Sequence, residues 1–253
     1  MARGLDARTS LEYALDESID SLTFVPTGSS ALMTWEESLW KDYTDGIVIL
    51  HRRRIVYERY FAALTPDRTH AAMSLTKSVT GTLAAMLAAE GALDRSRKVA
   101  DYVPELEGSA FGDATVEQVL DMTTSLRYTE HYADRRAEVW QYAAAGSPFP
   151  KPAAYEGPVG YFEYLRTLRS SVAHDEVFAY KTPNADVAGW IVSRISGKSV
   201  AELLSERIWS RLGMELDAYF QVDAKGAPST SGGLSAGLRD MARFGELLRN
   251  EGM

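Results

Sequence analysis

The sequence predicts an α+β fold in which a β-hairpin precedes a series of helices. Residues 47–51 and 55–61 are apolar, β-branched segments on either side of an arginine turn, as in a hairpin. Residues 79–93, 187–195 and 235–248 instead carry helix formers or apolar residues at helical spacing. The 253 residues suffice for one large domain or two small ones.

Composition narrows the class of protein. The net charge of −8 argues against a dedicated nucleic-acid surface, and the absence of cysteine excludes disulfides and thiolate metal sites. No apolar run approaches the roughly 20 residues of a membrane span, and residues 1–6 lack the apolar core of a signal peptide. We therefore expect a cytoplasmic chain with a small-molecule partner, neither nucleic acid nor membrane, and leave a homodimer open.

The N-terminal part is predicted to be an arm or cap over residues 1–44, followed by one domain over residues 45–253. Residues 10–19 are expected to form a helix, residues 26–30 a loop and residues 35–43 a short helix. In the hairpin, the continuous apolar run of the first strand predicts burial on both faces, whereas the second strand alternates.

Capping signals predict the later helices. Thr115, with Gln118 three residues on, begins one helix, and Ser199 begins another. Asn184 is expected to cap the helix over residues 187–195, after an extended Phe178–Tyr180 segment. Residues 160–168 are expected to be helical, 219–222 a short strand and 231–234 a tight turn, with Ser235 starting the last helix.

Residues 123–160 are predicted to form a long loop, which in a compact domain is often functional. The loop is rich in aromatic residues that suit a substrate pocket, although they equally suit packing of the loop onto the core. They are Tyr128, Tyr132, Trp140, Tyr142 and Phe149.

Ser74 and Lys77 form an S-x-x-K pair at or near the expected start of the helix that runs through residues 79–93, in which Gly91 is a stop signal. Residues three apart are neighbours on a helix, so the amine would lie beside the hydroxyl. Serine needs an adjacent base to act as a nucleophile, and lysine serves as one only when its surroundings remove its proton. On S-x-x-K alone, an N-capped helix with a solvated lysine is the more frequent explanation.

A histidine-based mechanism is the rival arrangement. The four histidines (His51, His70, His131 and His174) are scattered, and the sequence has no G-x-S-x-G elbow and no helical histidine pair for zinc. His174-Asp175-Glu176 is expected to be a solvated turn.

Several ordered motifs carry a family resemblance. After the hairpin and S-x-x-K come V-A-D-Y-V-P-E-L at 99–106, V-x-x-V-L-x-M at 116–122 and Y-x-x-x-N at 180–184. G-K-S at 197–199, L-G-M at 212–214 and G-G-L-S-x-x-x-R-D-M-A-R-F-G at 232–245 complete the series. The chain resembles the serine β-lactamase and penicillin-binding-protein-like hydrolases, and among them most the 6-aminohexanoate-dimer (nylon oligomer) hydrolases and related carboxylesterases.

The resemblance implies a β-lactamase/transpeptidase-like fold, an antiparallel sheet flanked by helices plus an all-helical region. It implies Ser74 as the acylated nucleophile, Lys77 as its base and Tyr180 as the proton shuttle to the leaving group. Tyr132 and Asn184 would contact the substrate. Trp140 of the aromatic loop is expected to be a third substrate-binding residue. Acyl transfer of this kind uses no metal and no cofactor.

Two departures from the family pattern matter. No [KH]-[ST]-G motif follows the Gly232-Gly233-Leu234 turn, and the chain stops at Met253 where relatives continue. We therefore expect a truncated chain from which the C-terminal strands are missing. The Tyr180–Asn184 segment is longer than the Tyr-x-Asn of β-lactamases, which favours the aminohexanoate-oligomer pattern.

The sequence thus predicts a serine hydrolase that cleaves an ester or linear amide through a Ser74 acyl-enzyme. Two alternatives stay open: a non-catalytic acyl-binding or regulatory module, and a D-alanyl-D-alanine carboxypeptidase or β-lactamase.

Overall fold

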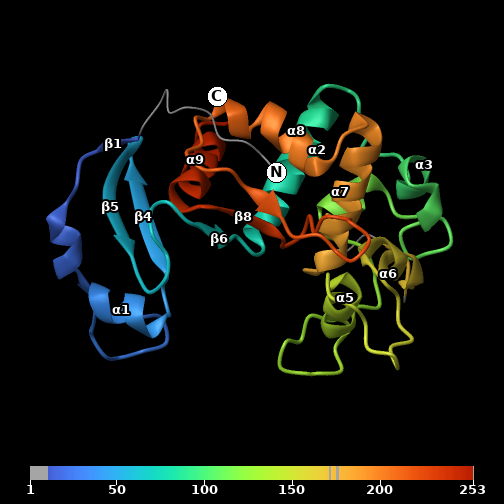
Figure 1. Cartoon of the computed structure of the whole chain (residues 1–253), viewed down its shortest axis with the longest axis horizontal. Helices are drawn as coiled ribbons and strands as arrows, with labels where there is room; N and C mark the ends of the chain where they lie inside the picture. The colour runs from blue at the N-terminus through green and yellow to red at the C-terminus, as the bar shows by residue number, and fades with distance from the viewer. Residues whose placement is uncertain (1–10, 171, 175–176, 253) are drawn as a thin grey trace. The chain divides into compact units, whose positions relative to one another are not determined.

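The computed structural model describes residues 11–170, 172–174 and 177–252 and has the predicted α+β composition (Figure 1). The described residues form two compact units. One, called here the helical unit, comprises residues 71–207 and 219–235; the other, the hairpin unit, comprises residues 11–70, 208–218 and 236–252. The boundary predicted between residues 44 and 45 stays a prediction.

The hairpin unit is built on the predicted antiparallel pair. β4 (Gly46–His51) and β5 (Arg54–Tyr60) are joined by Arg52 and Arg53, both with positive φ (51° and 66°), the conformation that two-residue hairpin turns require. β5 alternates between buried and more exposed positions as predicted. The expected burial of the first strand on both faces is wrong, because its apolar residues are only half-buried.

The segment before the hairpin differs from the prediction. The helix expected over residues 10–19 is wrong: β1 (Glu12–Tyr13) pairs in parallel with β5, and a 3-10 turn, η1 (Glu17–Ser21), follows (Figure 1). Ser10 lies outside the described residues. Asp16 accepts the Ser18 N–H at 3.0 Å and so favours the turn over a longer helix.

The loop and the short helix predicted before the hairpin are confirmed, whereas the two strands that flank the loop were not predicted. β2 (Thr23–Phe24) and β3 (Met33–Thr34) flank the predicted loop, and α1 (Trp35–Lys41) is the predicted short helix. Its start is fixed by a capping box between Thr34 and Glu37.

The last helix begins later than predicted. Leu234–Gly237 form a strand, β8, which pairs with β7 (Tyr219–Phe220), and α9 (Leu238–Arg249) starts only after it. Ser235 is therefore a strand residue, because a partner strand distant in sequence outweighs its capping propensity. Within the hairpin unit α9 packs against β4. A 3-10 turn, η3 (Trp209–Arg211), completes this unit.

The helical unit is organised around α7 (Thr182–Ser196), which contacts α2, α3, α4, α6 and α8. Its residues 183–192 are all buried, as expected for a helix surrounded by others. The surrounding elements are α2 (Leu75–Ala89), α3 (Val99–Tyr102), η2 (Pro104–Leu106), α4 (Val116–Leu120), α6 (Tyr161–Thr167) and α8 (Val200–Arg207).

Most of the predicted helix boundaries in this unit are confirmed. Thr115 forms a capping box with Gln118, and Ser199 forms one with Glu202. Gly91 follows α2 with φ of 74°, a conformation that glycine adopts without strain. Asn184 does not cap α7, because the helix already begins at Thr182, with Pro183 in its first turn.

Three further segments differ from the prediction or were not predicted. Residues 123–160 are not one loop, since they contain α5 (Glu138–Gly146). The Lys151 amine donates to the carbonyls of Ala145 and Ser147, both at 3.1 Å, and so closes the C-terminal end of α5. Phe178–Tyr180 form no strand, whereas β6 (Thr69–Ala71), just before Ser74, was not predicted.

Of the helices within the described ranges, none combines the length and apolar character needed to cross a bilayer.

Candidate active site

A cavity of about 220 Å³ lies within the helical unit at the start of α2. Its wall combines the segment around Ser74, part of the aromatic region 123–160, the start of α7 and the turn before β8. The lining residues are Met73, Ser74, Lys77, Tyr132, Val139, Tyr142, Ala143, Tyr161, Thr182, Gln221, Ser229, Ser231, Gly232 and Gly233.

Ser74 is the N-cap residue of α2 and follows a residue with an unusual backbone conformation. Met73, directly before it, has a φ of 45°, a left-handed conformation that costs a non-glycine residue free energy and is concentrated at functional sites. Ala72 anchors the segment by donating its N–H to the Leu234 carbonyl at 2.8 Å. Ser74 caps the helix through its backbone only, so its exposed hydroxyl is free for other contacts. Among the described residues the Ser74 N–H donates no hydrogen bond.

Lys77 lies one helical turn further on, on the predicted face. Its Nζ atom is 3.1 Å from the Ser74 Oγ and donates to the Ser231 carbonyl at 2.8 Å. The second contact fixes the half-buried amine from the opposite side, so that it stays directed at the hydroxyl. A hydroxyl and an amine at this separation have the geometry of a nucleophile and its base.

Tyr180 lies beside the same amine. The Lys77 Nζ is 5.0 Å from the centroid of the Tyr180 ring, within the range of a cation–π contact. Within the described part of the chain, the Tyr180 hydroxyl makes no hydrogen bond. The structure therefore brings together the three residues predicted to be catalytic, with the tyrosine approaching through its ring.

Tyr132 lines the cavity, and Trp140, which is not one of the lining residues, packs against its ring. Their ring centroids are 6.0 Å apart with an interplanar angle of 82°, an edge-to-face pair. The Tyr132 hydroxyl donates to Glu130 at 3.1 Å. The pKa of this phenol is raised, mainly by partial burial and to a smaller extent by the charge of Glu130. Glu130 also accepts the N–H of Thr182, which ties this region to the start of α7.

Asn184 is not brought to the cavity. Its side chain is fully buried, and its Oδ1 accepts the Thr124 hydroxyl at 2.7 Å. It is absent from the residues that line the cavity. The structure thus places it against Thr124, in the segment that follows α4.

Asp186 is a buried acid of the site that the sequence interpretation missed. Its carboxyl accepts hydrogen bonds from the Tyr142 hydroxyl at 2.6 Å, the Ser231 N–H at 3.0 Å and the Thr230 hydroxyl at 3.1 Å. Burial raises the pKa of Asp186, and these donors together with Lys77 oppose the increase. An acidic residue between Ala185 and Val187, on an otherwise apolar helix, was the available signal.

Histidine does not contribute to the cavity lining. His174 is buried, with its Nδ1 accepting the Ser125 N–H at 3.0 Å and its Nε2 3.3 Å from the Asp113 carboxylate. The predicted solvated turn is therefore wrong for His174, while Asp175 and Glu176 lie outside the described residues.

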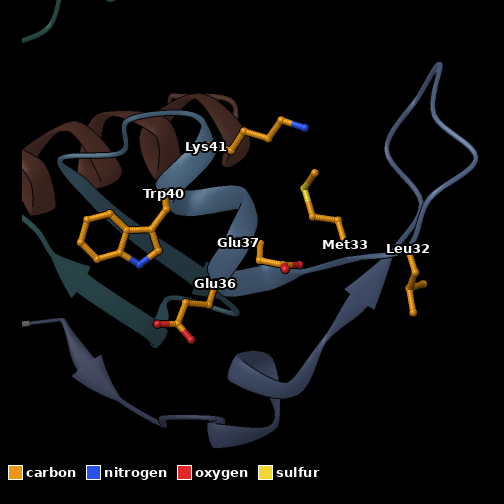
Figure 2. Close-up of a pocket in the computed structure, with 6 residues that line it drawn as sticks. All are labelled: Leu32, Met33, Glu36, Glu37, Trp40 and Lys41. Carbon is orange, nitrogen blue, oxygen red and sulfur yellow. The ribbon is translucent and has the colours of Figure 1, made fainter.

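A larger cavity of about 590 Å³ in the hairpin unit is not the candidate site. Figure 2 shows its lining side chains spread along α1 and the segment before it, with Trp40 at one end and Leu32 at the other. The other four are Met33, Glu36, Glu37 and Lys41. These six residues include no serine beside a base.

Comparisons with known proteins agree with this geometry. The family model described as Beta-lactamase matches residues 38–253. The 6-aminohexanoate-dimer hydrolase of Paenarthrobacter ureafaciens is 36% identical over 219 residues, which cover 86% of this chain and 55% of the relative.

Solved structures show the same fold. The "Putative 6-aminohexanoate-dimer hydrolase from Bacillus anthracis" matches with a TM-score of 0.90 and 32% identity, covering 100% of this chain and 66% of that one. An octameric penicillin-binding protein homologue from Pyrococcus abyssi matches at TM-score 0.64 and 19% identity over 86% of this chain and 55% of its own, a likeness of fold alone. This chain thus spans 55% of the curated relative's length. The family model and the two more similar relatives together establish that the chain has the β-lactamase-like fold and belongs to the β-lactamase family.

Proposed function

We propose that the protein is a serine hydrolase that cleaves an ester or a linear amide through an acyl-enzyme on Ser74. The observation that carries the proposal is the 3.1 Å separation of the Lys77 Nζ and the Ser74 Oγ at the wall of the cavity. The name of the curated relative, 6-aminohexanoate-dimer hydrolase, favours a short aliphatic amide or its ester analogue as the substrate.

In the acylation step the Lys77 amine takes the Ser74 proton while Oγ forms a bond to the substrate carbonyl carbon. The carbonyl oxygen becomes an oxyanion. The Ser74 N–H at the helix start, which donates no hydrogen bond to the described residues, is a suitable donor to this oxyanion. Cleavage of the carbonyl–leaving-group bond then needs a proton on the departing nitrogen or oxygen. Tyr180, beside the lysine, is the group that we propose transfers it.

In the deacylation step a water molecule attacks the acyl carbon and gives up its proton through the same groups. The acid leaves, and the Ser74 hydroxyl is regenerated. Tyr132, at the rim of the cavity with Trp140 packed on its ring, would contact the substrate.

Covalent labelling tests the nucleophile. The 253-residue chain is treated with a fluorophosphonate probe, digested and mapped by mass spectrometry, and the label is expected on the peptide that contains Ser74. Ser74→Ala should abolish labelling, whereas Ser78→Ala, an exposed serine one turn further along α2, should retain it. Label on another residue, or equal labelling of Ser74→Ala, would contradict the proposal.

Turnover assays separate the substrate classes. p-Nitrophenyl acetate and the 6-aminohexanoate dimer are offered in large excess over the protein, and product is expected beyond one equivalent with at least one of them. Release of a single equivalent with both would instead indicate an acyl-binding module that does not turn over.

A further inference from the structure

Asp186 sits where a carboxyl group influences the catalytic amine without touching it. It lies in the second turn of α7, is 1% exposed, and its two oxygens accept three hydrogen bonds. Two of the donors, Thr230 and Ser231, belong to the turn before β8, and the third, Tyr142, lines the cavity. Burying a carboxyl group costs free energy unless it is hydrogen-bonded, and these three donors offset that cost and fix the position of the group.

Lys77 and Asp186 hold the two polar backbone groups of one residue. The N–H of Ser231 donates to the Asp186 carboxyl at 3.0 Å, and the carbonyl of Ser231 accepts from the Lys77 amine at 2.8 Å. Because of this shared residue, the position of the carboxyl determines where the carbonyl points. The carbonyl in turn determines the direction of the amine.

The turn has little freedom to relax if the carboxyl is lost. On its other side α2 holds it through two buried threonines: the Thr80 hydroxyl donates to the Thr230 carbonyl at 2.7 Å, and the Leu234 N–H donates to the Thr76 hydroxyl at 3.1 Å. α7 approaches so closely that a Cβ added at Gly189 would lie 2.2 Å from the Thr230 hydroxyl. Displacement on the α7 side is therefore passed on to Ser231.

Among the described residues, the charged and titratable groups that interact with Asp186 are one lysine and three tyrosines. Lys77 on α2 is the cation, and Tyr142, Tyr128 and Tyr161 face the carboxyl from α5, from the segment before it and from α6. In the proposed acylation step Lys77 becomes an ammonium ion, and a buried carboxylate close to it stabilises that charge.

We infer that Asp186 is a positioning residue of acylation, which orients the Lys77 amine through Ser231 and stabilises the ammonium ion formed when Ser74 loses its proton. The inference rests on the proposed function, since it needs Lys77 to act as the base of Ser74. Asp186 itself acts through Ser231 and Lys77.

The test compares the rates at which a fluorophosphonate labels Ser74 in Asp186→Asn and in the wild-type chain. The asparagine keeps the shape of the side chain and one acceptor but removes the charge. Asp223→Asn is the matched control, because Asp223 is also buried in the helical unit and accepts backbone N–H groups, from Tyr161 at 2.7 Å and from Ala227 at 2.9 Å. Thermal unfolding of each variant measures the structural effect separately.

Asp186→Asn is expected to slow labelling about 10- to 100-fold, the effect of losing an interaction with a charged group. With p-nitrophenyl acetate the loss should appear in kcat while KM changes little. Asp223→Asn should label within about threefold of the wild type even where it unfolds at a lower temperature. Labelling of Asp186→Asn at the wild-type rate would overturn the inference and leave the proposed function intact, whereas a wild-type chain that is not labelled at Ser74 would overturn both.

Tyr142→Phe keeps the inference testable if Asp186→Asn does not fold. It removes the 2.6 Å donor and leaves the carboxyl in place, so labelling should slow by about three- to tenfold. An unchanged rate in a folded Tyr142→Phe variant would count against the inference.

Discussion

The amine of Lys77 is held between the hydroxyl of Ser74, 3.1 Å away, and the carbonyl of Ser231, 2.8 Å away. The two contacts come from segments more than 150 residues apart in the chain. One is the contact with the proposed nucleophile, and the other holds the flexible lysine side chain in place.

Replacing Lys77 by methionine should slow the acylation of Ser74 by about 10²- to 10⁴-fold, the usual contribution of a general base. Methionine has a similar length and fills the same space, so the fold should persist. The measurement is stopped-flow acylation by p-nitrophenyl acetate, with Lys98→Met, an exposed lysine of the helical unit, as the control. Acylation within a few-fold of the wild type in Lys77→Met would remove lysine from the mechanism.

Replacing Trp140 by alanine should raise KM, because Tyr132 loses the ring that holds it at the rim of the cavity. An edge-to-face pair contributes about 0.5–1.5 kcal/mol, which corresponds to an increase of roughly 2- to 10-fold. Trp140→Phe should restore most of the affinity. Phe149→Ala, which truncates a 74% exposed aromatic of the same region, serves as the control and should leave KM unchanged. If Phe149→Ala and Trp140→Ala raise KM equally, the specific role of the Tyr132–Trp140 pair is contradicted.

Replacing Gly189 by alanine should destabilise the helical unit and slow acylation together. The added methyl group would meet the Thr230 side chain at 2.2 Å, and such overpacking costs about 1–3 kcal/mol. Relief of the clash moves Thr230 and the neighbouring Ser231, on whose carbonyl the Lys77 amine depends. Urea unfolding and the rate of Ser74 labelling measure the two effects.

Gly81→Ala is the matched substitution on α2. A methyl group there meets nothing within 4 Å among the described residues, and alanine in a helix interior is about 0.5–1 kcal/mol more favourable than glycine. This variant should therefore be slightly more stable than the wild type and label at the same rate. If Gly189→Ala and Gly81→Ala had the same free energy of unfolding and the same rate of Ser74 labelling, the contact between α7 and Thr230 would not be tight.

The sequence was sufficient where the signal is local. Thr115 and Ser199 each form a capping box with a residue only three positions away, so the sequence next to them predicts where the helix begins. The hairpin turn likewise lies between two apolar strands that are adjacent in the sequence. S-x-x-K likewise places Ser74 and Lys77 on one helical face without any further information.

The predictions from sequence failed where the conformation or contacts of a residue depend on a partner that is distant in the sequence. Ser235 is a strand residue because it pairs with Tyr219. Asn184 turns into the interior, where its Oδ1 accepts a hydrogen bond from the hydroxyl of Thr124, 60 residues earlier. Asp186 is the clearest case. Its proposed role rests on a hydrogen bond from Ser231, 45 residues later in the chain, and nothing in the residues next to Asp186 indicates that contact.

Glu58 in the hairpin unit provides a prediction about stability and pH. Its carboxylate pairs with the Arg239 guanidinium at 2.6 and 3.0 Å and accepts the hydroxyls of Tyr60 at 2.5 Å and Tyr13 at 2.9 Å, which joins β5 to α9 and β1. Burial opposes ionisation of Glu58, but the hydrogen bonds from Arg239, Tyr60 and Tyr13 outweigh it and lower its pKa below the ordinary value of 4.5.

Glu58→Gln should therefore reduce the free energy of unfolding by about 1–3 kcal/mol at pH 7, because Arg239 loses the charge of Glu58 and keeps only its 3.2 Å contact with the Glu215 carboxylate. A lowered pKa in the folded state means that the contribution of Glu58 is fully present above pH 4.5 and is lost as the pH falls through the folded pKa. The stabilities of wild type and Glu58→Gln should then converge in acid. Urea unfolding between pH 7 and pH 3 measures this convergence.

Glu12→Gln is the control, because it removes an exposed carboxylate paired with Arg54 and should change stability little at any pH. A difference between wild type and Glu58→Gln that stays constant down to pH 3 would mean that the charge of Glu58 does not stabilise this unit.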